Sequence, residues 1–153
     1  MNYTKGNILE SNTEVIINPV NTVGVMGKGL ALAFKKQFPH NYKIYKEACK
    51  NQAIDIGKLL LVDESTLEQK KFVINFPTKK HWRSSSKIEY IEEGLKDLVR
   101  IIETQKFESM AVPALGCGLG GLEWGSVKLL LEKYLGNIDT TDIVIYQPNY
   151  FKP

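Results

Sequence analysis

The chain has 153 residues, of which 43% are hydrophobic and 24% are charged, as expected for one globular domain with a buried core. No apolar run approaches the ~20 residues of a membrane span, and the first residues lack the apolar stretch of a secretory signal. The net charge of +3 is too small by itself to indicate a nucleic-acid partner. Cys49 and Cys117 have no paired spacing, and with His40 and His81 they form no zinc-like cluster. We therefore expect a cytoplasmic protein with no membrane partner and no metal.

Short apolar runs alternate along the chain with longer stretches that have helical spacing. The pattern predicts strands over residues 3–5, 15–17, 58–62, 71–76, 110–112 and 143–146. It predicts helices that open at 30–34, span 41–50, and pass through 88–102 and 127–134. Strands that are apolar throughout and alternate with helices indicate an α/β protein, in which a largely parallel sheet is covered on both faces.

Polar residues beside these segments predict helix caps and one ion pair. Asn41 is expected to cap the helix 41–50, and the run Ser84-Ser85-Ser86 to cap the helix that follows it. On that helix, Glu92 and Lys96 have the i,i+4 spacing of a favourable ion pair.

Two glycine-rich loops follow predicted strands, one at residues 18–29 and the other at Gly116–Gly121. Glycine allows φ > 0 and lets backbone N–H groups approach a ligand closely. The helix that opens behind each loop adds a partial positive charge of about 0.5 of an elementary charge. Both loops lie at the carboxyl ends of strands, where sheets of this class bind ligands. Two such loops in one domain suit a ligand with two linked phosphates.

The second loop also satisfies the dinucleotide pattern G-x-G-x-x-G through Gly116, Gly118 and Gly121. That pattern expects an acidic residue about 20 positions further on, at the end of the next strand. Asp142 begins its strand instead, and no second nucleotide-binding half follows. An NAD-linked oxidoreductase is therefore disfavoured. A P-loop is excluded, because Lys28 is followed by glycine where Ser or Thr is required.

Segments 15–21, 27–31 and 112–121, in this order, resemble a macrodomain over essentially the whole chain. Segments 21–29 and 75–83 resemble more closely the macrodomain of the DarG antitoxins, which removes ADP-ribose from thymidine bases of DNA and so reverses the DarT toxin. The terminal glutamate-ADP-ribose hydrolases share the Thr78-Lys79 element. The resemblance implies a single macrodomain over residues 1–153, an α/β/α sandwich with a mixed, largely parallel sheet, and ADP-ribose as ligand without a cofactor.

The resemblance also implies roles for particular residues. Asn7, where most macrodomains have Asp, would meet the adenine with Ile8, and Tyr146 would cover the adenine face. The second loop would take the diphosphate, and Asn21 with residues 27–29 would surround the distal ribose. The full set expected to bind ADP-ribose is Asn7, Ile8, Asn18, Val25, Met26, Gly27, Gly29, Leu30, Thr78, Gly116, Cys117, Gly118, Leu119, Gly120 and Tyr146.

The segment 77–87 carries the expected chemistry. Lys80, His81, Trp82 and Arg83 are expected to bind DNA, the cations at phosphates and the rings on an unpaired base, at ~1–3 kcal/mol per stacked base. Because a duplex hides the modified base edge, the expected DNA is single-stranded or flipped. The alternative to a functional role is that this segment is a solvated basic loop anchored by a tryptophan.

Lys79 is the expected catalytic residue, together with Asn21. Lys80 and Arg83 are expected to lower the pKa of Lys79, against the opposing effect of a bound diphosphate. Its amine would attack the anomeric carbon, or its cation would stabilise the departing base; the sequence leaves both open. The glutamate-specific relatives pair their lysine with an aspartate where this chain has Gly120. His81 or Asn21 with a water could replace that base.

The resemblance implies an ADP-ribosyl-DNA hydrolase, with two alternatives: a hydrolase for ADP-ribose on protein glutamate or small molecules, and a non-catalytic ADP-ribose reader. We expect a monomer that meets a DarT-like toxin through a region outside this chain, which is either a trimmed domain or a stand-alone version. Other residues are expected to be structural: Cys117 as a small filler, His40 at the surface, and Trp124 in the core or at its rim.

Overall fold

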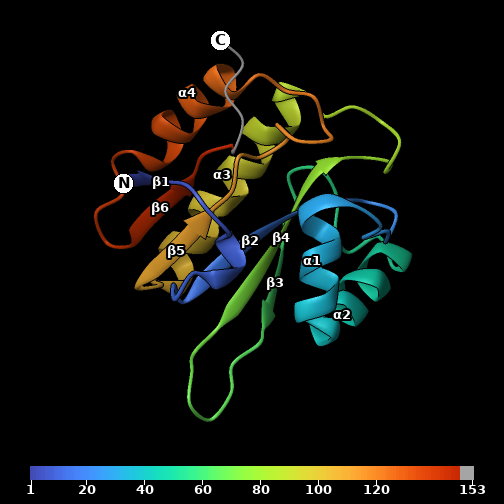
Figure 1. Cartoon of the computed structure of the whole chain (residues 1–153), viewed down its shortest axis with the longest axis horizontal. Coiled ribbons are helices and arrows are strands. Elements are labelled where there is room, and N and C mark those ends of the chain that lie inside the picture. The colour runs from blue at the N-terminus through green and yellow to red at the C-terminus, as the bar shows by residue number, and fades with distance from the viewer. Residues whose placement is uncertain (149–153) are drawn as a thin grey trace.

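A six-stranded sheet forms the middle layer of residues 1–148, the part of the chain that the computed structural model describes (Figure 1). The strands are β1 (Asn2–Thr4), β2 (Val15–Asn21), β3 (Leu60–Asp63), β4 (Phe72–Lys79), β5 (Ser109–Val112) and β6 (Asp142–Tyr146). Their order is β1-β6-β5-β2-β4-β3, and only the β3–β4 pair is antiparallel. The predicted mixed, largely parallel sheet is confirmed.

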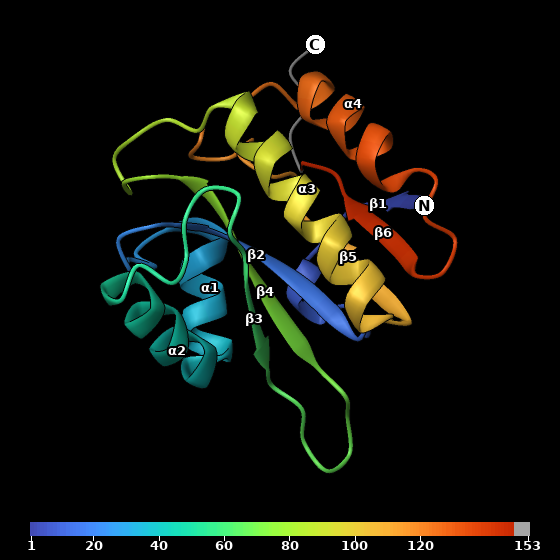
Figure 2. The ribbon, with the colours of Figure 1, turned by 180° about the vertical axis from the view of Figure 1, so that it is seen from behind.

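Helices cover both faces of the sheet (Figures 1 and 2). They are the 3₁₀ helix η1 (Ile8–Glu10) and the α-helices α1 (Gly29–Gln37), α2 (Pro39–Lys50), α3 (Ile88–Gln105) and α4 (Trp124–Leu135). The alternation within β2 explains the two layers: Ile17 packs in the core under α3 and α4, whereas Ile16 packs with Phe34 of α1. No helix within residues 1–148 is both long and apolar enough to cross a membrane.

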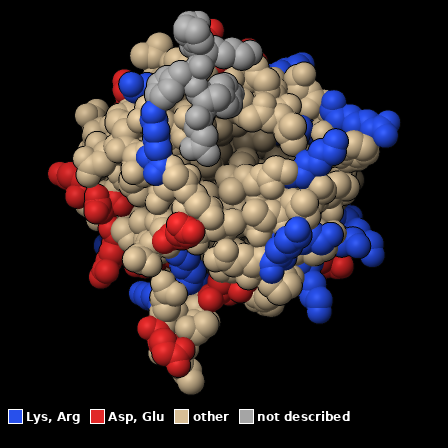
Figure 3. Space-filling view, viewed as in Figure 1, with Lys and Arg blue, Asp and Glu red and all other residues tan. Residues whose placement is uncertain are grey.

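The parallel strands end at a common edge, and the molecule is hollowed there (Figure 3). β4 runs through Lys79, beyond the predicted end at Phe76, because its ladder with β2 continues past Pro77. This extension brings Lys79 beside Asn21 at the edge of the sheet.

Three local expectations from the sequence are wrong. Asn41 lies inside α2, which begins at Pro39, and its buried amide exchanges hydrogen bonds with Asn75 of β4 in place of capping the helix. The residue that caps α3 is Lys87, without a side-chain bond, because Ser86 is buried against the second glycine loop. Lys96 pairs at 3.0 Å with Glu93.

The expected partner of Lys96, Glu92, is bound across the helix interface instead. It accepts hydrogen bonds from Tyr134 and Lys133 of α4, at 2.8 and 3.4 Å. Two expectations nearby agree with the structure: Trp124 starts α4 and packs partly buried against the core, and His40 is exposed.

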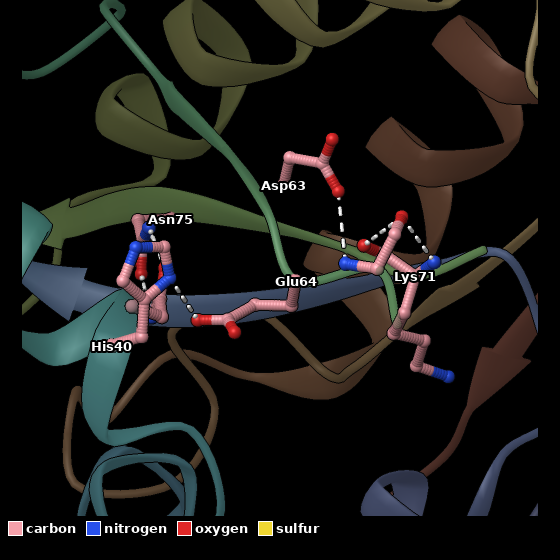
Figure 4. A network of polar contacts seen from close by, with 7 residues as sticks. His40, Asp63, Glu64, Lys71 and Asn75 are labelled. Atoms are coloured by element: carbon pink, nitrogen blue, oxygen red, sulfur yellow. Dashed lines mark hydrogen bonds and ion pairs between the residues drawn. The ribbon is translucent and has the colours of Figure 1, made fainter. Parts of the chain in front are cut away.

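The hairpin between β3 and β4 is closed at its base by polar contacts (Figure 4). Asp63 accepts the Ser65 N–H at 2.8 Å, and the Ser65 hydroxyl accepts the Lys71 N–H at 3.0 Å. His40 Nδ1 lies 3.1 Å from Glu64 Oε1, which ties α2 to the same hairpin. These contacts hold the start of β4 in register with its neighbours.

Gly94 of α3 provides a test of the packing between that helix and the sheet. A Cβ at Gly94 would collide with the Phe76 ring of β4, which is fully buried. We expect Gly94→Ala to lower the free energy of unfolding by about 1–3 kcal/mol, although alanine has the higher helix propensity.

Gly125 in α4 is the matched control, because a Cβ there would meet only the Glu123 carboxylate at 3.3 Å. When both variants and the wild type are unfolded in urea, Gly125→Ala should leave the free energy of unfolding unchanged or slightly raised. A Gly94→Ala protein as stable as the wild type would contradict this packing.

Candidate functional site

The loops that follow the strands enclose one cleft of about 960 Å³. Both glycine loops, the Gly6–Ile8 segment, the end of β4 and the residues after β6 contribute to its walls. On the face seen in Figure 3, Lys and Arg side chains gather to the right of the hollow, and most Asp and Glu lie to its left and below. No carboxylate is among the described residues that line the cleft.

The cleft brings together most of the residues that the sequence singled out. Lys79 and Asn21, predicted to be catalytic, and Trp82, predicted to bind DNA, all line it. The predicted ADP-ribose residues that line it are Asn7, Ile8, Val25, Gly27, Gly29, Leu30, Thr78, Gly116, Cys117, Gly118, Leu119, Gly120 and Tyr146.

Two predicted ligand residues, Asn18 and Met26, do not line the cleft. They are 0% and 1% exposed, and the Asn18 amide donates to Asn75 Oδ1 at 3.2 Å and contacts Met26 Sδ at 3.9 Å. Their side chains therefore support the first loop from the interior.

Sequence reasoning missed several lining residues. They are Gly6, Pro19, Val20, Ala31, Pro113, Ala114, Gln147 and Pro148. Each lies within three residues of a predicted one on the same loop or strand end, so the placement of the loops at the sheet edge was the available signal. Lys28, which lies within the residues 27–29 expected around the distal ribose, also lines the cleft and adds a charge to its wall.

The second glycine loop has no room for side chains at two of its positions. Gly116 has φ +74°, and a Cβ there would lie 2.7 Å from Leu122 Cδ1. A Cβ at Gly120 would lie 2.6 Å from the Gly116 carbonyl oxygen and would collide with the Ser86 hydroxyl. The Ser86 N–H donates to the Gly120 carbonyl at 3.0 Å. An acidic side chain at position 120 is therefore incompatible with this loop.

Asn21 organises the first glycine loop. Its Oδ1 accepts the N–H groups of Val23 and Val25 at 3.1 and 3.4 Å, and its Nδ2 donates to the Val25 carbonyl at 2.7 Å. The hydroxyl of Tyr45, fully buried in α2, lies 2.9 Å from the same Oδ1, and burial raises the pKa of Tyr45, so this hydroxyl stays protonated and donates. The same hydroxyl lies 2.9 Å from the Asn21 backbone carbonyl, so its single proton is shared between the two oxygens. With its Oδ1 bound to two loop N–H groups, Asn21 acts here as a positioning residue.

Lys79 lies half-buried at the end of β4. Its ammonium donates to the Trp82 carbonyl at 3.1 Å. The pKa of Lys79 is lowered, as the sequence predicted, but the cause is different. Burial of the amine lowers it, in place of the expected charges of Lys80 and Arg83. An amine with a lowered pKa in a cleft without carboxylates is suited to act as a nucleophile or as an unneutralised cation.

Of the four predicted DNA-binding residues, Trp82 alone lines the cleft. Trp82 is 39% exposed, with the His81 ring stacked near it at a centroid distance of 5.5 Å and the Arg83 guanidinium 4.4 Å from its ring centre. His81 Nδ1 accepts the Arg83 N–H at 3.1 Å, which leaves the proton of the neutral ring on Nε2. Lys80 lies 5.8 Å from the Tyr90 ring, and neither it nor His81 lines the cleft.

Cys117 lines the cleft within the second loop. It is 3% exposed, and burial raises the pKa of its thiol to about 11. The thiolate is the nucleophilic form of cysteine, so this side chain is a small apolar filler, as the sequence predicted.

Comparison with known proteins shows the family to which this chain belongs. The profile of the Macro domain family matches residues 17–130. Proteins named DNA ADP-ribosyl glycohydrolase, from Thermus aquaticus and Mycobacterium tuberculosis, are 46% and 47% identical over 97% and 96% of this chain. The chain spans only 41% and 42% of the length of those relatives.

Solved structures give the same result. The macrodomains of Thermus aquaticus DarG and Mycobacterium tuberculosis DarG match with TM-scores of 0.91 and 0.93, at 46% and 47% identity. The match covers 96% and 97% of this chain and 97% of each of theirs. Thermosipho africanus DarTG in complex with ADP-ribose matches with a TM-score of 0.92 and 40% identity, over 99% of this chain and 43% of its own. The chain belongs to the macrodomain family, and within it to the DarG macrodomains.

Asn21→Ala tests the positioning role assigned to that residue. The variant removes the acceptor of two loop N–H groups and one of the two acceptors near the buried Tyr45 hydroxyl, so we expect the free energy of unfolding to fall by about 1–3 kcal/mol. Backbone amide exchange at Val23 and Val25 should also accelerate.

The exposed neighbour Val23 supplies the control for this experiment, since Val23→Ala removes a side chain that is 47% exposed. That variant should keep wild-type stability. Wild-type amide exchange in the Asn21→Ala loop would show that the loop holds its shape without this amide.

Proposed function

We propose that this macrodomain binds ADP-ribose in the cleft and removes it from thymidine bases of single-stranded DNA. The observation that carries the proposal is the arrangement of one cleft: two glycine loops suited to a diphosphate, and Lys79 at the end of β4 with no carboxylate among the described lining residues. The name of the relatives, DNA ADP-ribosyl glycohydrolase, supports the same reaction.

The side chains at the two ends of the cleft support one orientation of the ligand. At one end, Asn7 caps η1 by accepting the Leu9 N–H at 3.0 Å, so its Nδ2 is left to donate to the adenine. Tyr146 lines the same end and would cover the adenine face. The diphosphate would lie along Gly116–Gly120, and the distal ribose would then reach Asn21 and Lys79.

The reaction replaces the bond between the anomeric carbon and the base nitrogen with a bond to water oxygen, and the base nitrogen takes a proton. Lys79 serves it in one of two ways. Its neutral amine attacks the anomeric carbon, forming an adduct that water then resolves, or its ammonium stabilises the negative charge that develops on the departing base. Both roles place the Lys79 nitrogen at the scissile bond.

The relatives also suggest the biological setting. A Thermosipho africanus relative, 38% identical, is named as a fusion of a DNA ADP-ribosyl transferase with a DNA ADP-ribosyl glycohydrolase. We propose that this chain acts as antitoxin to a DarT-like transferase, in the cytoplasm and as a monomer. The expected contact of Lys80, His81, Trp82 and Arg83 with DNA belongs to this proposal; a base that stacks on Trp82 has to share its ring with Arg83.

Gly118→Val tests ligand binding by the second loop. A Cβ at Gly118 would meet nothing within 4 Å, and its φ lies outside the left-handed region, so the variant should fold with a wild-type Tm. Its branched side chain would fill the space proposed for the diphosphate. Calorimetry should show that the affinity for ADP-ribose falls by about tenfold or more, which corresponds to ~1.4 kcal/mol. Unchanged affinity would place the ligand elsewhere.

Lys79→Ala separates an enzyme from a reader. Incubated with an ADP-ribosylated thymidine oligonucleotide, the variant should release no ADP-ribose, because it lacks the group at the scissile bond. Its affinity for free ADP-ribose should stay within about threefold of the wild type, less than ~0.7 kcal/mol. Turnover by Lys79→Ala would contradict the assigned role. A wild type that releases nothing from either the oligonucleotide or ADP-ribosylated protein would be a reader.

The pH profile then distinguishes the two roles of Lys79. Since burial lowers the pKa of Lys79, the inflection should lie below the usual lysine value of about 10.4. If the neutral amine attacks, kcat/KM rises with pH up to that inflection; if the ammonium is required, kcat/KM falls through it. Lys79→Arg, which stays charged, should retain activity only in the second case.

A further inference from the structure

A second, smaller pocket of about 250 Å³ adjoins the cleft. Lys28, Lys79, Trp82 and Leu119 line both spaces, so the pocket is continuous with the end of the cleft where Lys79 lies. Its other walls are Arg83, Ser84 and Ser85. A volume below the ~300–1,000 Å³ of small-molecule sites suits one phosphate-sized group with its waters.

The described residues that line the pocket give it positive charge and no carboxylate. Lys28, Lys79 and Arg83 line it, and no Asp or Glu is among its described lining residues. Within residues 1–148, none of these three cations lies within 4.0 Å of a carboxylate; the ion pairs of the structure involve other residues. The hydroxyl groups of Ser84 and Ser85 add neutral donors. The combination is chemically suited to a phosphate.

The wall of the small pocket that contains Arg83 is held in place by contacts within its own loop. The Arg83 N–H donates to His81 Nδ1 at 3.1 Å, and the Ser84 N–H donates to the His81 carbonyl at 2.9 Å. The Arg83 guanidinium lies 4.4 Å from the centre of the Trp82 ring. A guanidinium held against an aromatic ring keeps its N–H edges available for two parallel bonds to phosphate oxygens.

From these observations we infer that the small pocket binds the backbone phosphate next to the ADP-ribosylated nucleotide. The inference rests on the proposed function. With the diphosphate of ADP-ribose along Gly116–Gly120, an anion beyond Lys79 belongs to the part of the substrate on the far side of the scissile bond. In a DNA strand, the first anion on that side is the phosphate that flanks the modified nucleotide. The pocket therefore makes the enzyme selective for a strand over a free nucleoside.

The experiment compares kcat/KM for two substrates: an ADP-ribosylated thymidine oligonucleotide, and the ADP-ribosylated thymidine nucleoside, which has no backbone phosphate. Arg83→Gln should lower kcat/KM for the oligonucleotide by about tenfold or more, the effect of losing one charge-assisted hydrogen bond. It should leave the nucleoside unchanged. Lys87→Gln is the matched control, because Lys87 is a cation on the same loop that lines neither space, and it should change neither value.

A third substrate tests the phosphate directly. An oligonucleotide with a neutral methylphosphonate at the flanking position should be a poor substrate for the wild type and no poorer for Arg83→Gln. If Arg83→Gln lowers kcat/KM equally for the oligonucleotide and the nucleoside, Arg83 acts at the scissile bond. If it lowers kcat/KM for neither substrate, the pocket binds no phosphate. Either result would overturn the inference.

Failure of the proposed function gives a different result, namely no release of ADP-ribose by the wild type from either substrate. In that case, binding of the same oligonucleotides, with and without the methylphosphonate, decides on the phosphate site. If the wild type binds both oligonucleotides with equal affinity, the phosphate site is overturned. If the wild type binds the methylphosphonate oligonucleotide more weakly, and Arg83→Gln binds both equally, the phosphate site is supported.

Discussion

The parallel pairing of β2 with β4 is the constraint on which the site depends. The ladder runs from Val15 to the sheet edge, with Val20 opposite Pro77 and Asn21 opposite Lys79. Thr78 is therefore the extra residue of a bulge, and this irregularity sets Asn21 and Lys79 side by side. Because side chains alternate along a strand, a shift of one residue would turn Lys79 to the opposite face.

The loop that carries the basic residues and the loop suited to the diphosphate form one unit. Ser86 donates its N–H to the Gly120 carbonyl, and its side chain occupies the space that a Cβ at Gly120 would need. The position of one loop thus fixes the shape of the other. The consequence is chemical as well as structural, since no acid fits at position 120 and the described walls of the cleft offer cations and amides in place of a carboxylate base.

The strands, helices and glycine loops could be predicted from the sequence because their signals are local: apolar runs, helical spacing and glycines between them. The errors came from tertiary contacts. Asn41 forms a buried amide pair with Asn75 in place of a cap, and β4 continues through Pro77, where a missing N–H predicts the end of a strand. The pKa of Lys79 is lowered by burial, which depends on the fold around it and cannot be judged from neighbouring residues in the chain.

The net charge of +3 by itself gave no reason to expect a nucleic-acid partner, and the structure shows that this charge is unevenly distributed. On α3, cations are neutralised by carboxylates one turn away, as in the pairs of Lys96 with Glu93 and of Arg100 with Asp97. At the cleft and the small pocket beside it, Lys28, Lys79 and Arg83 form no ion pair with a carboxylate of residues 1–148. Electrostatic attraction for a phosphate backbone depends on charge left uncompensated at one place, so a chain that is nearly neutral overall can still present a strongly positive site.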